Sequence, residues 1–296
     1  VYKREKSNLR QYDIIFVPGP MHYQIAMKEL GKYTLIVEAG WPKYDCMDLR
    51  NEELKLRDKI NSLPYKYTLL YAPSFAHTYE WKTLLPYMKK LRCNIIIKNH
   101  VYIGDNQSLP VGKEELYRFM LDSAAEMERE AYSYNQKNIL IIPRCLNICS
   151  LFPYVDVLIS DRSSVLVEFL PYGISIETGR YGIKECDYAP EVSCVVKEVF
   201  FMNEKRILNL LSSLESFEEF IVNNISRVKN AAVKYVNTNM NSGRLIAYSI
   251  DRYISENEKK KKSFLINIFP VYANSYYLFL KRITASIIKK LLVLLR

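Results

Sequence analysis

The stretch DVLISDRSSVLVEFL, residues 156–170, joins an apolar run to a segment with helical spacing. Residues 157–160 are typical of a buried strand, and residues 164–173, which end in glycine, are typical of a helix. The turn between them is polar and consists of Ser160, Asp161, Arg162, Ser163 and Ser164. A strand that leads directly into a helix is the building unit of an α/β fold.

The same alternation of strands and helices runs through most of the chain. We expect further short apolar strands at 13–17, 34–40, 67–72, 94–98, 138–142 and 174–177. We expect helices at 21–31, 78–91, 112–132 and 147–155, and three more between 203 and 254. Because these strands are apolar throughout, both faces of the sheet must be covered, which is typical of a parallel α/β sheet.

The chain has 296 residues, 49% of them hydrophobic, which suffices for one large or two modest domains with a real core. Its first residue is Val1, and the charged segment 1–13 has no apolar region of a secretory signal. We therefore expect this sequence to be a piece of a longer protein.

The cysteines predict buried free thiols in a reducing compartment. Cys145 and Cys149 are four residues apart, but no second pair and no nearby histidine completes a zinc-ligand spacing. The other four are Cys46, Cys93, Cys186 and Cys194. No metal-ligand cluster, glycine-rich dinucleotide fingerprint or phosphate-loop lysine motif is present, so we expect neither a metal nor a cofactor.

The net charge of +10 is concentrated at the C-terminal end. Residues 251–296 carry +7 and the other 250 residues only +3. Segment 274–296 places lysines and an arginine on one helical face and leucines and isoleucines on the other, which favours an anionic membrane surface as partner of 259–296. An ordinary amphipathic helix packed on the domain is the alternative. A membrane span over 263–280 is disfavoured by its asparagines and proline, and nucleic acid is not expected as a partner.

Ligands of open α/β sheets bind at the carboxyl ends of the strands, so polar residues there are the candidates for a site. Ser74 and His77 follow the strand at 67–72. Lys98 is the last residue of the strand at 94–98, and His100 follows that strand. At the junction after 157–160, backbone N–H groups, Ser163, Ser164 and Arg162 suit a phosphate, and Glu168 suits ribose hydroxyls. Each has a simpler interpretation. Asp161 and the serines can merely cap the helix, and the histidines and Glu168 can be structural.

These strand ends together resemble the CDP-glycerol glycerophosphotransferases, the polyol-phosphate polymerases of teichoic acids and related bacterial capsules. DVLISDRSSVLVEFL resembles their D-hydrophobic-hydrophobic-S/T-D-Y-S-S signature, and it is the most specific match. Four shorter segments also resemble the family. LLYAPSF resembles its YAPT segment and IIIKNH its K-x-H-P segment. GWPKYD resembles its G-Y-P-R-x-D segment, and MNSGRLIAYSI (residues 240–250) resembles its N-D-G segment. The resemblance covers roughly residues 10–250, in the family's order.

The resemblance implies a GT-B fold, in which two Rossmann-like halves enclose the ligand. It implies a remnant of the N-terminal, acceptor-side half at 1–60, a nucleotide-donor domain at 61–250 and a basic membrane-associating tail at 251–296. His100 and Asp161 become candidate catalytic residues. The candidate donor-binding residues are Ser74, Lys98, Ser160, Arg162, Ser163, Ser164 and Glu168.

Three departures from the family pattern stand out. Arg162 replaces the usual tyrosine, and Val101 follows His100 where the family has proline. The family's second catalytic histidine lies in an H-G-T-P-x-K motif, which this sequence lacks.

The implied reaction is phosphoryl transfer from a CDP-polyol to a polymer or lipid-linked acceptor, at the cytoplasmic face of the bacterial membrane. His100 would take the hydroxyl proton or bind the phosphoryl group, with an imidazole that titrates near neutral pH. Two alternatives remain open: a glycosyltransferase or hexose-phosphate transferase that uses a sugar nucleotide, and a truncated, non-catalytic fragment that binds nucleotide or membrane.

Overall fold

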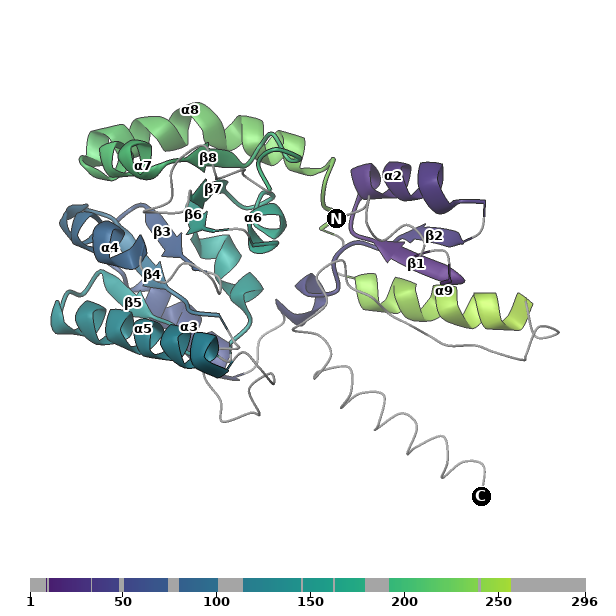
Figure 1. Cartoon of the computed structure of the whole chain (residues 1–296), viewed down its shortest axis with the longest axis horizontal. Helices are drawn as coiled ribbons and strands as arrows, with labels where there is room; N and C mark the ends of the chain where they lie inside the picture. The colour runs from purple at the N-terminus through teal and green to yellow at the C-terminus, as the bar shows by residue number, and fades with distance from the viewer. Residues whose placement is uncertain are drawn as a thin grey trace, which may run out of the picture.

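The computed structural model describes residues 9, 11–32, 34–47, 51–73, 80–100, 114–144, 146–161, 163–178, 192–238 and 241–256. Within them, a large unit built on a six-stranded sheet lies beside a small unit built on a two-stranded sheet (Figure 1). Every strand pair in both sheets is parallel. The α/β class expected from the alternating pattern is confirmed.

The large sheet has the order β5-β4-β3-β6-β7-β8. Its strands are β3 (Thr68–Tyr71), β4 (Asn94–Ile97), β5 (Ile139–Ile141), β6 (Val157–Ser160), β7 (Ile174–Thr178) and β8 (Phe200–Met202). Counted within this sheet, the order is 3-2-1-4-5-6, the doubly wound arrangement of many nucleotide-binding proteins. Its order reverses between β3 and β6, where Leu69 pairs with Val157 and Tyr71 with Ile159.

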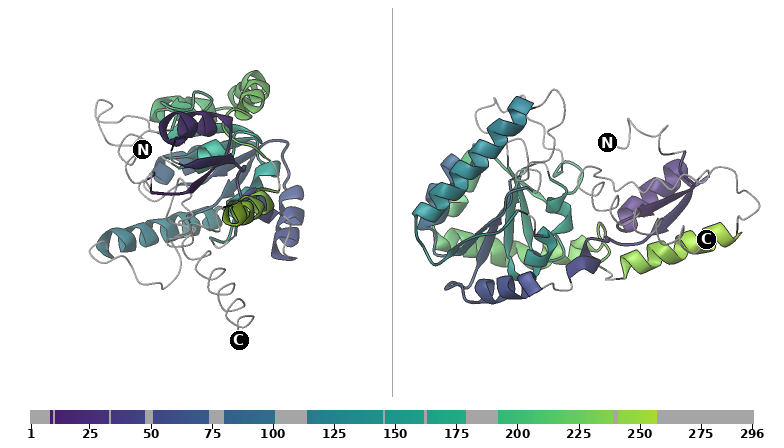
Figure 2. Two further views of the ribbon diagram at one scale, coloured as in Figure 1. Left: turned by 90° about the vertical axis from the view of Figure 1, so that its right-hand side faces the viewer. Right: turned by 90° about the horizontal axis from the view of Figure 1, so that it is seen from below.

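Helices cover both faces of the large sheet (Figure 2). This explains why the central strands β3, β4 and β6 are buried along their whole length. The helices of this unit are α3 (Asn51–Asn61), α4 (Glu80–Lys90), α5 (Glu114–Ser133), α6 (Val165–Glu168), α7 (Glu204–Leu211) and α8 (Leu214–Ala232). A 3₁₀ helix, η2 (Ile148–Tyr154), leads into β6.

The small unit consists of β1 (Ile14–Val17), α2 (Pro20–Leu30) and β2 (Leu35–Glu38). Pro20 opens α2, where its fixed φ suits the first helical turn. A separate apolar cluster of Val17, Ala26, Leu30 and Ile36 holds the helix on the sheet. A 3₁₀ helix, η1 (Tyr44–Met47), follows β2.

The chain returns to the small unit after α8. The N–H of Met21 donates to the carbonyl oxygen of Lys234 at 2.8 Å, and the N–H of Asn237 donates to that of Pro18 at 2.7 Å. The last described helix, α9 (Ser242–Glu256), then runs alongside β1 and β2 (Figures 1 and 2). Asp45 accepts hydrogen bonds from the N–H groups of Ser242 and Gly243 and thereby caps α9.

The sequence missed two elements, α3 and β8. Residues 51–61 are strongly polar and residues 200–202 form only a short strand, so neither gives a clear periodic signal. The helix expected at 164–173 is also too long, because regular α-helix ends at Glu168 and continues only as turns to Gly173. The division at residues 60 and 250 stays a prediction, and α9 runs across the second boundary.

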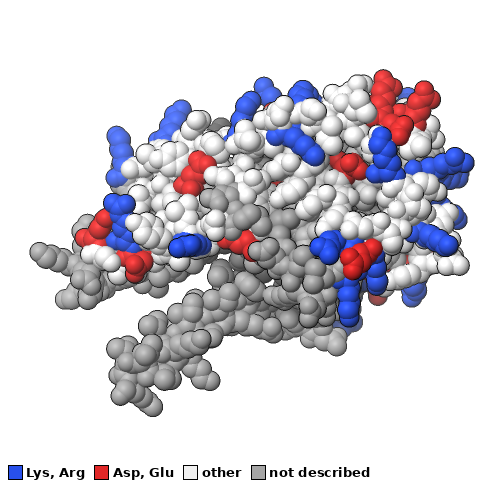
Figure 3. Space-filling view, turned by 180° about the vertical axis from the view of Figure 1, so that it is seen from behind, with Lys and Arg blue, Asp and Glu red and all other residues white. Residues whose placement is uncertain are grey.

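Among the described residues, none of the helices is both long and apolar enough to cross a bilayer. The tail from 257 onward lies outside them. Cys93 and Cys149 are buried thiols as expected, but Cys194 is exposed. Lysine and arginine side chains are spread over the rear face, with acidic side chains among them, and form no single patch there (Figure 3).

Candidate functional site

The carboxyl ends of β3 and β6 meet at the point where the strand order of the large sheet reverses. Such a point is the usual ligand crevice of an open α/β sheet. Ser160, at the end of β6, is fully buried, and its Oγ donates to the carbonyl oxygen of Ala72, just after β3, at 2.7 Å. This bond fixes the two strand ends relative to each other, so Ser160 lies beneath the crevice.

Glu168 is the centre of a polar cluster at this edge. Its carboxylate is fully buried and accepts from Lys43 Nζ at 2.9 Å (Oε1) and 3.1 Å (Oε2). Ser164 Oγ donates to Oε1 at 2.7 Å, and Cys149 Sγ lies 4.0 Å from Oε2. Ser164 therefore contributes its hydroxyl to Glu168 and makes no side-chain cap of α6, which excludes side-chain capping as its role.

Lys43 comes from the GWPKYD segment, which follows β2 of the small unit. That segment is attached to the large unit at two further points. The buried Tyr44 hydroxyl donates to the carbonyl oxygen of Glu168, and Asn147 Nδ2 donates to that of Lys43 at 3.4 Å. Burial raises the pKa of Tyr44, which keeps the hydroxyl protonated as a donor. The segment thus brings one cation from the small unit to the buried carboxylate of Glu168.

The end of β4 is held by a second polar network. Lys98 is buried, and its ammonium group donates to the carbonyl oxygens of Asn99 at 3.4 Å and Arg144 at 3.1 Å. Glu128 on α5 accepts from Asn99 Nδ2 at 2.7 Å and from Arg144 at 2.9 and 3.0 Å. Lys98, predicted to bind the donor, is therefore directed at backbone oxygens in this structure.

His100 is the residue after Asn99, beyond the end of β4, and is partly buried. Burial lowers its pKa to about 4, and the positive charges of Lys98 and Lys43 act in the same direction. The imidazole is therefore neutral at physiological pH, which differs from the near-neutral titration expected from the sequence. A neutral imidazole has one nitrogen that can accept a proton and one N–H that can donate a hydrogen bond, so both roles expected of His100 stay predictions.

Asp161 is buried at the end of β6 and lies near a second acid, Glu80, at the start of α4. Thr178 Oγ1 donates to Glu80 Oε2 at 2.8 Å. Burial raises the pKa of Glu80 well above its usual range, and the Asp161 carboxyl raises it further. Glu80 therefore keeps its proton to a higher pH than an exposed glutamate does. It lies near Asp161, whose carbonyl oxygen accepts from the N–H of Ser163 at 2.5 Å.

The remaining predicted residues divide into two groups. Ser163 is a partly exposed residue of the turn between β6 and α6. Its Oγ accepts a weak hydrogen bond from the N–H of Val165 at 3.4 Å. Ser74, His77 and Arg162 lie outside the described residues. Sequence reasoning did not select Lys43 or Glu80 as site residues. Lys43 follows a predicted strand end, so the rule that selected His100 could have found it.

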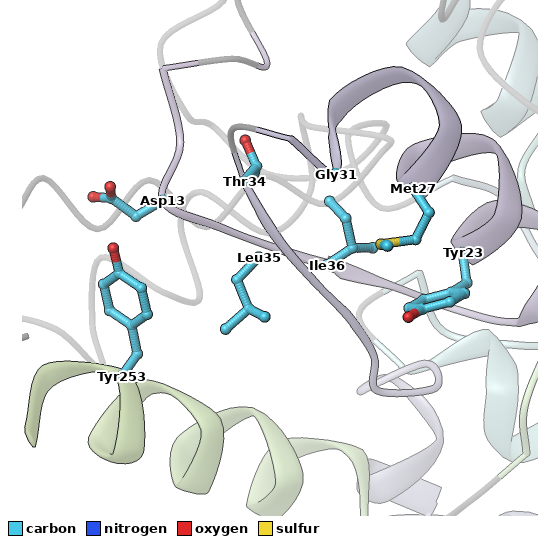
Figure 4. A pocket seen from close by; sticks show the side chains of 8 residues that line it. All are labelled: Asp13, Tyr23, Met27, Gly31, Thr34, Leu35, Ile36 and Tyr253. Atoms are coloured by element: carbon cyan, nitrogen blue, oxygen red, sulfur yellow. The ribbon is translucent and has the colours of Figure 1, made fainter. Parts of the chain in front are cut away.

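No group of three metal-ligating side chains occurs in the described ranges. A cavity of about 340 Å³ lies elsewhere, between the small sheet and α9 (Figure 4). Its lining includes Asp13 and Leu35, which precede or begin the two strands, and Tyr253, whose hydroxyl points toward Asp13. It therefore lies at the amino ends of the strands, away from the crevice.

A comparison with protein families matches residues 2–172 to the family described as CDP-glycerol:poly(glycerophosphate) glycerophosphotransferase. The chain belongs to this family. The match includes GWPKYD, the end of β4 and the turn from Ser160 to Ser164. The resemblance to this family is therefore confirmed, while the segment MNSGRLIAYSI at 240–250 lies outside the matched residues. A comparison with curated protein sequences found no match.

Solved structures show the fold of this glycerophosphotransferase-family chain. It is similar to the wall teichoic acid polymerase TagF, with 18% identity and a TM-score of 0.52 over 86% of this chain and 62% of that one. A TagF variant with a histidine replaced by asparagine gives 18% identity and a TM-score of 0.53, over 87% and 62%. The GT-B-like α/β fold is thus confirmed. The chain spans 62% of the length of these polymerase structures.

Proposed function

We propose that this chain carries out polyol-phosphate transfer in the synthesis of a bacterial cell-surface polymer. A CDP-polyol such as CDP-glycerol would be the donor, and a polymer or lipid-linked chain the acceptor. The acceptor oxygen would form a bond to the β-phosphorus as the bond from that phosphorus to the bridging oxygen breaks, and CMP would leave. Membership of the glycerophosphotransferase family supports this reaction class.

One observation supports the proposal for this chain. The neutral imidazole of His100 lies at the same edge of the sheet as the buried carboxylate of Glu168, which accepts from Lys43 and Ser164. His100 would accept the proton of the attacking hydroxyl. Ser163, at the mouth of the turn, would donate to a phosphate oxygen. Glu168 would accept from ribose hydroxyls. Such a site acts by positioning and charge stabilisation, which is what phosphoryl transfer needs.

Asp161 and Lys98 have supporting roles in this proposal. Both are buried, Asp161 at the end of β6 and Lys98 against backbone oxygens. They would shape the crevice around His100 and Ser163. α6 has only four residues, so the phosphate contact is assigned to side chains rather than to a helix dipole.

The experiment is calorimetric titration of the full chain with CDP-glycerol, CDP-ribitol, CMP and UDP-N-acetylglucosamine. We expect cytidine nucleotides to bind and the Ser163→Ala/Ser164→Ala variant to bind them at least tenfold more weakly. A preference for UDP-N-acetylglucosamine would favour the sugar-nucleotide alternative instead.

Transfer itself is tested by release of CMP in the presence of a glycerol-phosphate oligomer. Nucleotide binding without CMP release would support the alternative of a non-catalytic fragment.

We also propose that the segment 259–296 binds the anionic inner surface of the bacterial membrane, where a lipid-linked acceptor would lie. The support is its sequence alone, with cations and apolar residues on opposite helical faces. The test is co-sedimentation of the full chain, and of a chain ending at Glu256, with phosphatidylglycerol vesicles. Equal binding of the two chains would contradict this assignment.

A further inference from the structure

The ion pair between Lys43 and Glu168 is unequal in its exposure. The Glu168 side chain is fully buried, whereas 23% of the Lys43 side chain is exposed. The lysine ammonium group donates to both carboxylate oxygens. It is therefore the member of the pair that an entering ligand can reach.

The backbone around Lys43 is fixed, but its side chain can change partner. The Tyr44 hydroxyl and the Asn147 amide hold this segment on the large unit through the carbonyl oxygens of Glu168 and Lys43. The ammonium group lies at the end of a flexible four-carbon stem and has three donors. A change of partner thus needs only side-chain rotation.

The other described cations at this edge have stable contacts of their own. Lys98 is directed at backbone carbonyl oxygens, and Arg144 makes a two-point ion pair with Glu128. Lys43, by contrast, has as its counter-ion the carboxylate to which the proposed function assigns the donor ribose. Entry of a nucleotide thus changes the surroundings of this one ion pair.

A diphosphate beside Glu168 would place two like charges next to each other at a buried site. A cation between them removes this repulsion. Lys43 lies close enough to both His100 and Glu168 to influence each of them. It is thus near both the proposed base and the proposed ribose-binding residue, where the phosphates of the donor would lie.

We propose that Lys43 is a donor-binding residue that neutralises Glu168 and that binds the diphosphate of the CDP-polyol when the donor enters. This inference rests on the proposed function. It assigns to the small unit a direct contact with the donor, and it gives the lysine of the GWPKYD segment a specific chemical task.

The test is calorimetric titration of the full chain and its Lys43→Met and Lys43→Arg variants with cytidine, CMP, CDP and CDP-glycerol. We expect Lys43→Met to weaken the binding of CDP and of CDP-glycerol at least tenfold, and the binding of cytidine less than threefold. Lys43→Arg should stay within about fivefold of the wild type, because it keeps the charge. Lys82→Met is the matched control. Lys43 pairs with a glutamate and lies over the Trp41 ring, and Lys82 does the same with Glu126 and Trp81, but on the surface of α4.

Lys43→Met leaves Glu168 buried without its counter-ion and can fail to fold for that reason. The double variant Lys43→Met/Glu168→Gln removes both charges. Its ratio of CDP to cytidine affinity should be at least tenfold lower than that of Glu168→Gln alone. An unchanged ratio would overturn the role of Lys43 while cytidine-selective binding still supports the proposed function. A wild-type chain that binds none of the four ligands would overturn both.

Discussion

The hydroxyl of Ser160 donates a 2.7 Å hydrogen bond to the carbonyl oxygen of Ala72, across the point where the sheet reverses its order. Both groups are buried, so Ser160→Ala leaves a buried acceptor without its donor. We expect a loss of about 1–2 kcal/mol in the free energy of unfolding, measured by urea denaturation. Donor affinity should change less than threefold.

Ser175→Ala is the matched control for this experiment. Ser175 is equally buried, and its Oγ donates to the carbonyl oxygen of Leu166 at 2.6 Å. Equal losses of stability in both variants would assign Ser160 a structural role. A tenfold loss of donor affinity in Ser160→Ala alone would restore the direct donor contact expected from the sequence.

His100→Asn is expected to lower the rate of CMP release at least 100-fold, since a positioned general base contributes about this much. Donor affinity should remain within about threefold, because the imidazole acts on the acceptor. His22→Asn, the same substitution on α2 of the small unit, should retain activity. Unchanged turnover in His100→Asn would remove this residue from the mechanism.

The pH dependence of kcat/KM should also report on His100. Its pKa is lowered to about 4, so the free enzyme keeps a neutral base down to that pH. We expect kcat/KM to be level between about pH 6 and 8 and to fall only as the pH approaches 4. A fall centred on the ordinary histidine value of 6.5 would show that the imidazole is not perturbed in the working enzyme.

Glu80 should make the protein less stable as the pH rises. Its pKa is higher in the folded chain than its ordinary value of 4.5, so above that value the unfolded chain releases the proton first. Stability therefore falls by about 1.4 kcal/mol for each pH unit between the unfolded and folded pKa values. Glu80→Gln, which resembles the protonated side chain, should remove this loss between about pH 5 and 8 in urea denaturation.

Glu126→Gln on α5 is the control for Glu80, because its carboxylate is about half exposed and pairs with Lys82. The free energy of unfolding of the Glu126→Gln variant should depend on pH in the same way as that of the wild type. If Glu80→Gln also follows the wild type, the Glu80 carboxyl is charged in the folded protein.

Gly19 permits a close approach of two chain segments. A Cβ at this position would lie 2.8 Å from the backbone nitrogen of Val236 and closer still to the carbonyl of Tyr235. We expect Gly19→Ala to lower the unfolding free energy by about 1–3 kcal/mol. Gly243→Ala should cost less, since its nearest neighbour is the movable carboxylate of Asp45. Equal effects in thermal denaturation would contradict this explanation.

The sequence predicted the sheet well because the strands are short, apolar and bounded by polar residues. It also selected one edge of this sheet as the candidate site: His100 follows β4, Ser160 ends β6, and Glu168 lies in the helix that follows β6. α3 was missed because its sequence is polar and its weakly amphipathic face gives little signal. The regular part of α6 was overestimated, because Pro171 and Gly173 follow a single helical turn.

The partners of side chains could not be predicted in the same way. GWPKYD, the signature turn and MNSGRLIAYSI are each weak or local in the sequence. In the structure, Lys43 of the first contacts Glu168 of the second, and Asp45 of the first caps the helix that begins in the third. These pairs are separated by 125 and 197 residues. A single sequence contains no information on which distant charges will meet.

The return of the chain to the small unit also sets an order of events during synthesis. β1, α2 and β2 are synthesised before the large unit, yet the hydrogen bonds of this region with Lys234, Asn237 and Ser242 require residues about 200 positions later. At about 5–20 residues per second, this interval lasts roughly 10–40 s. During that time the two-stranded sheet has neither α9 nor the segment 234–237 beside it. The small unit therefore needs protection from aggregation during this interval.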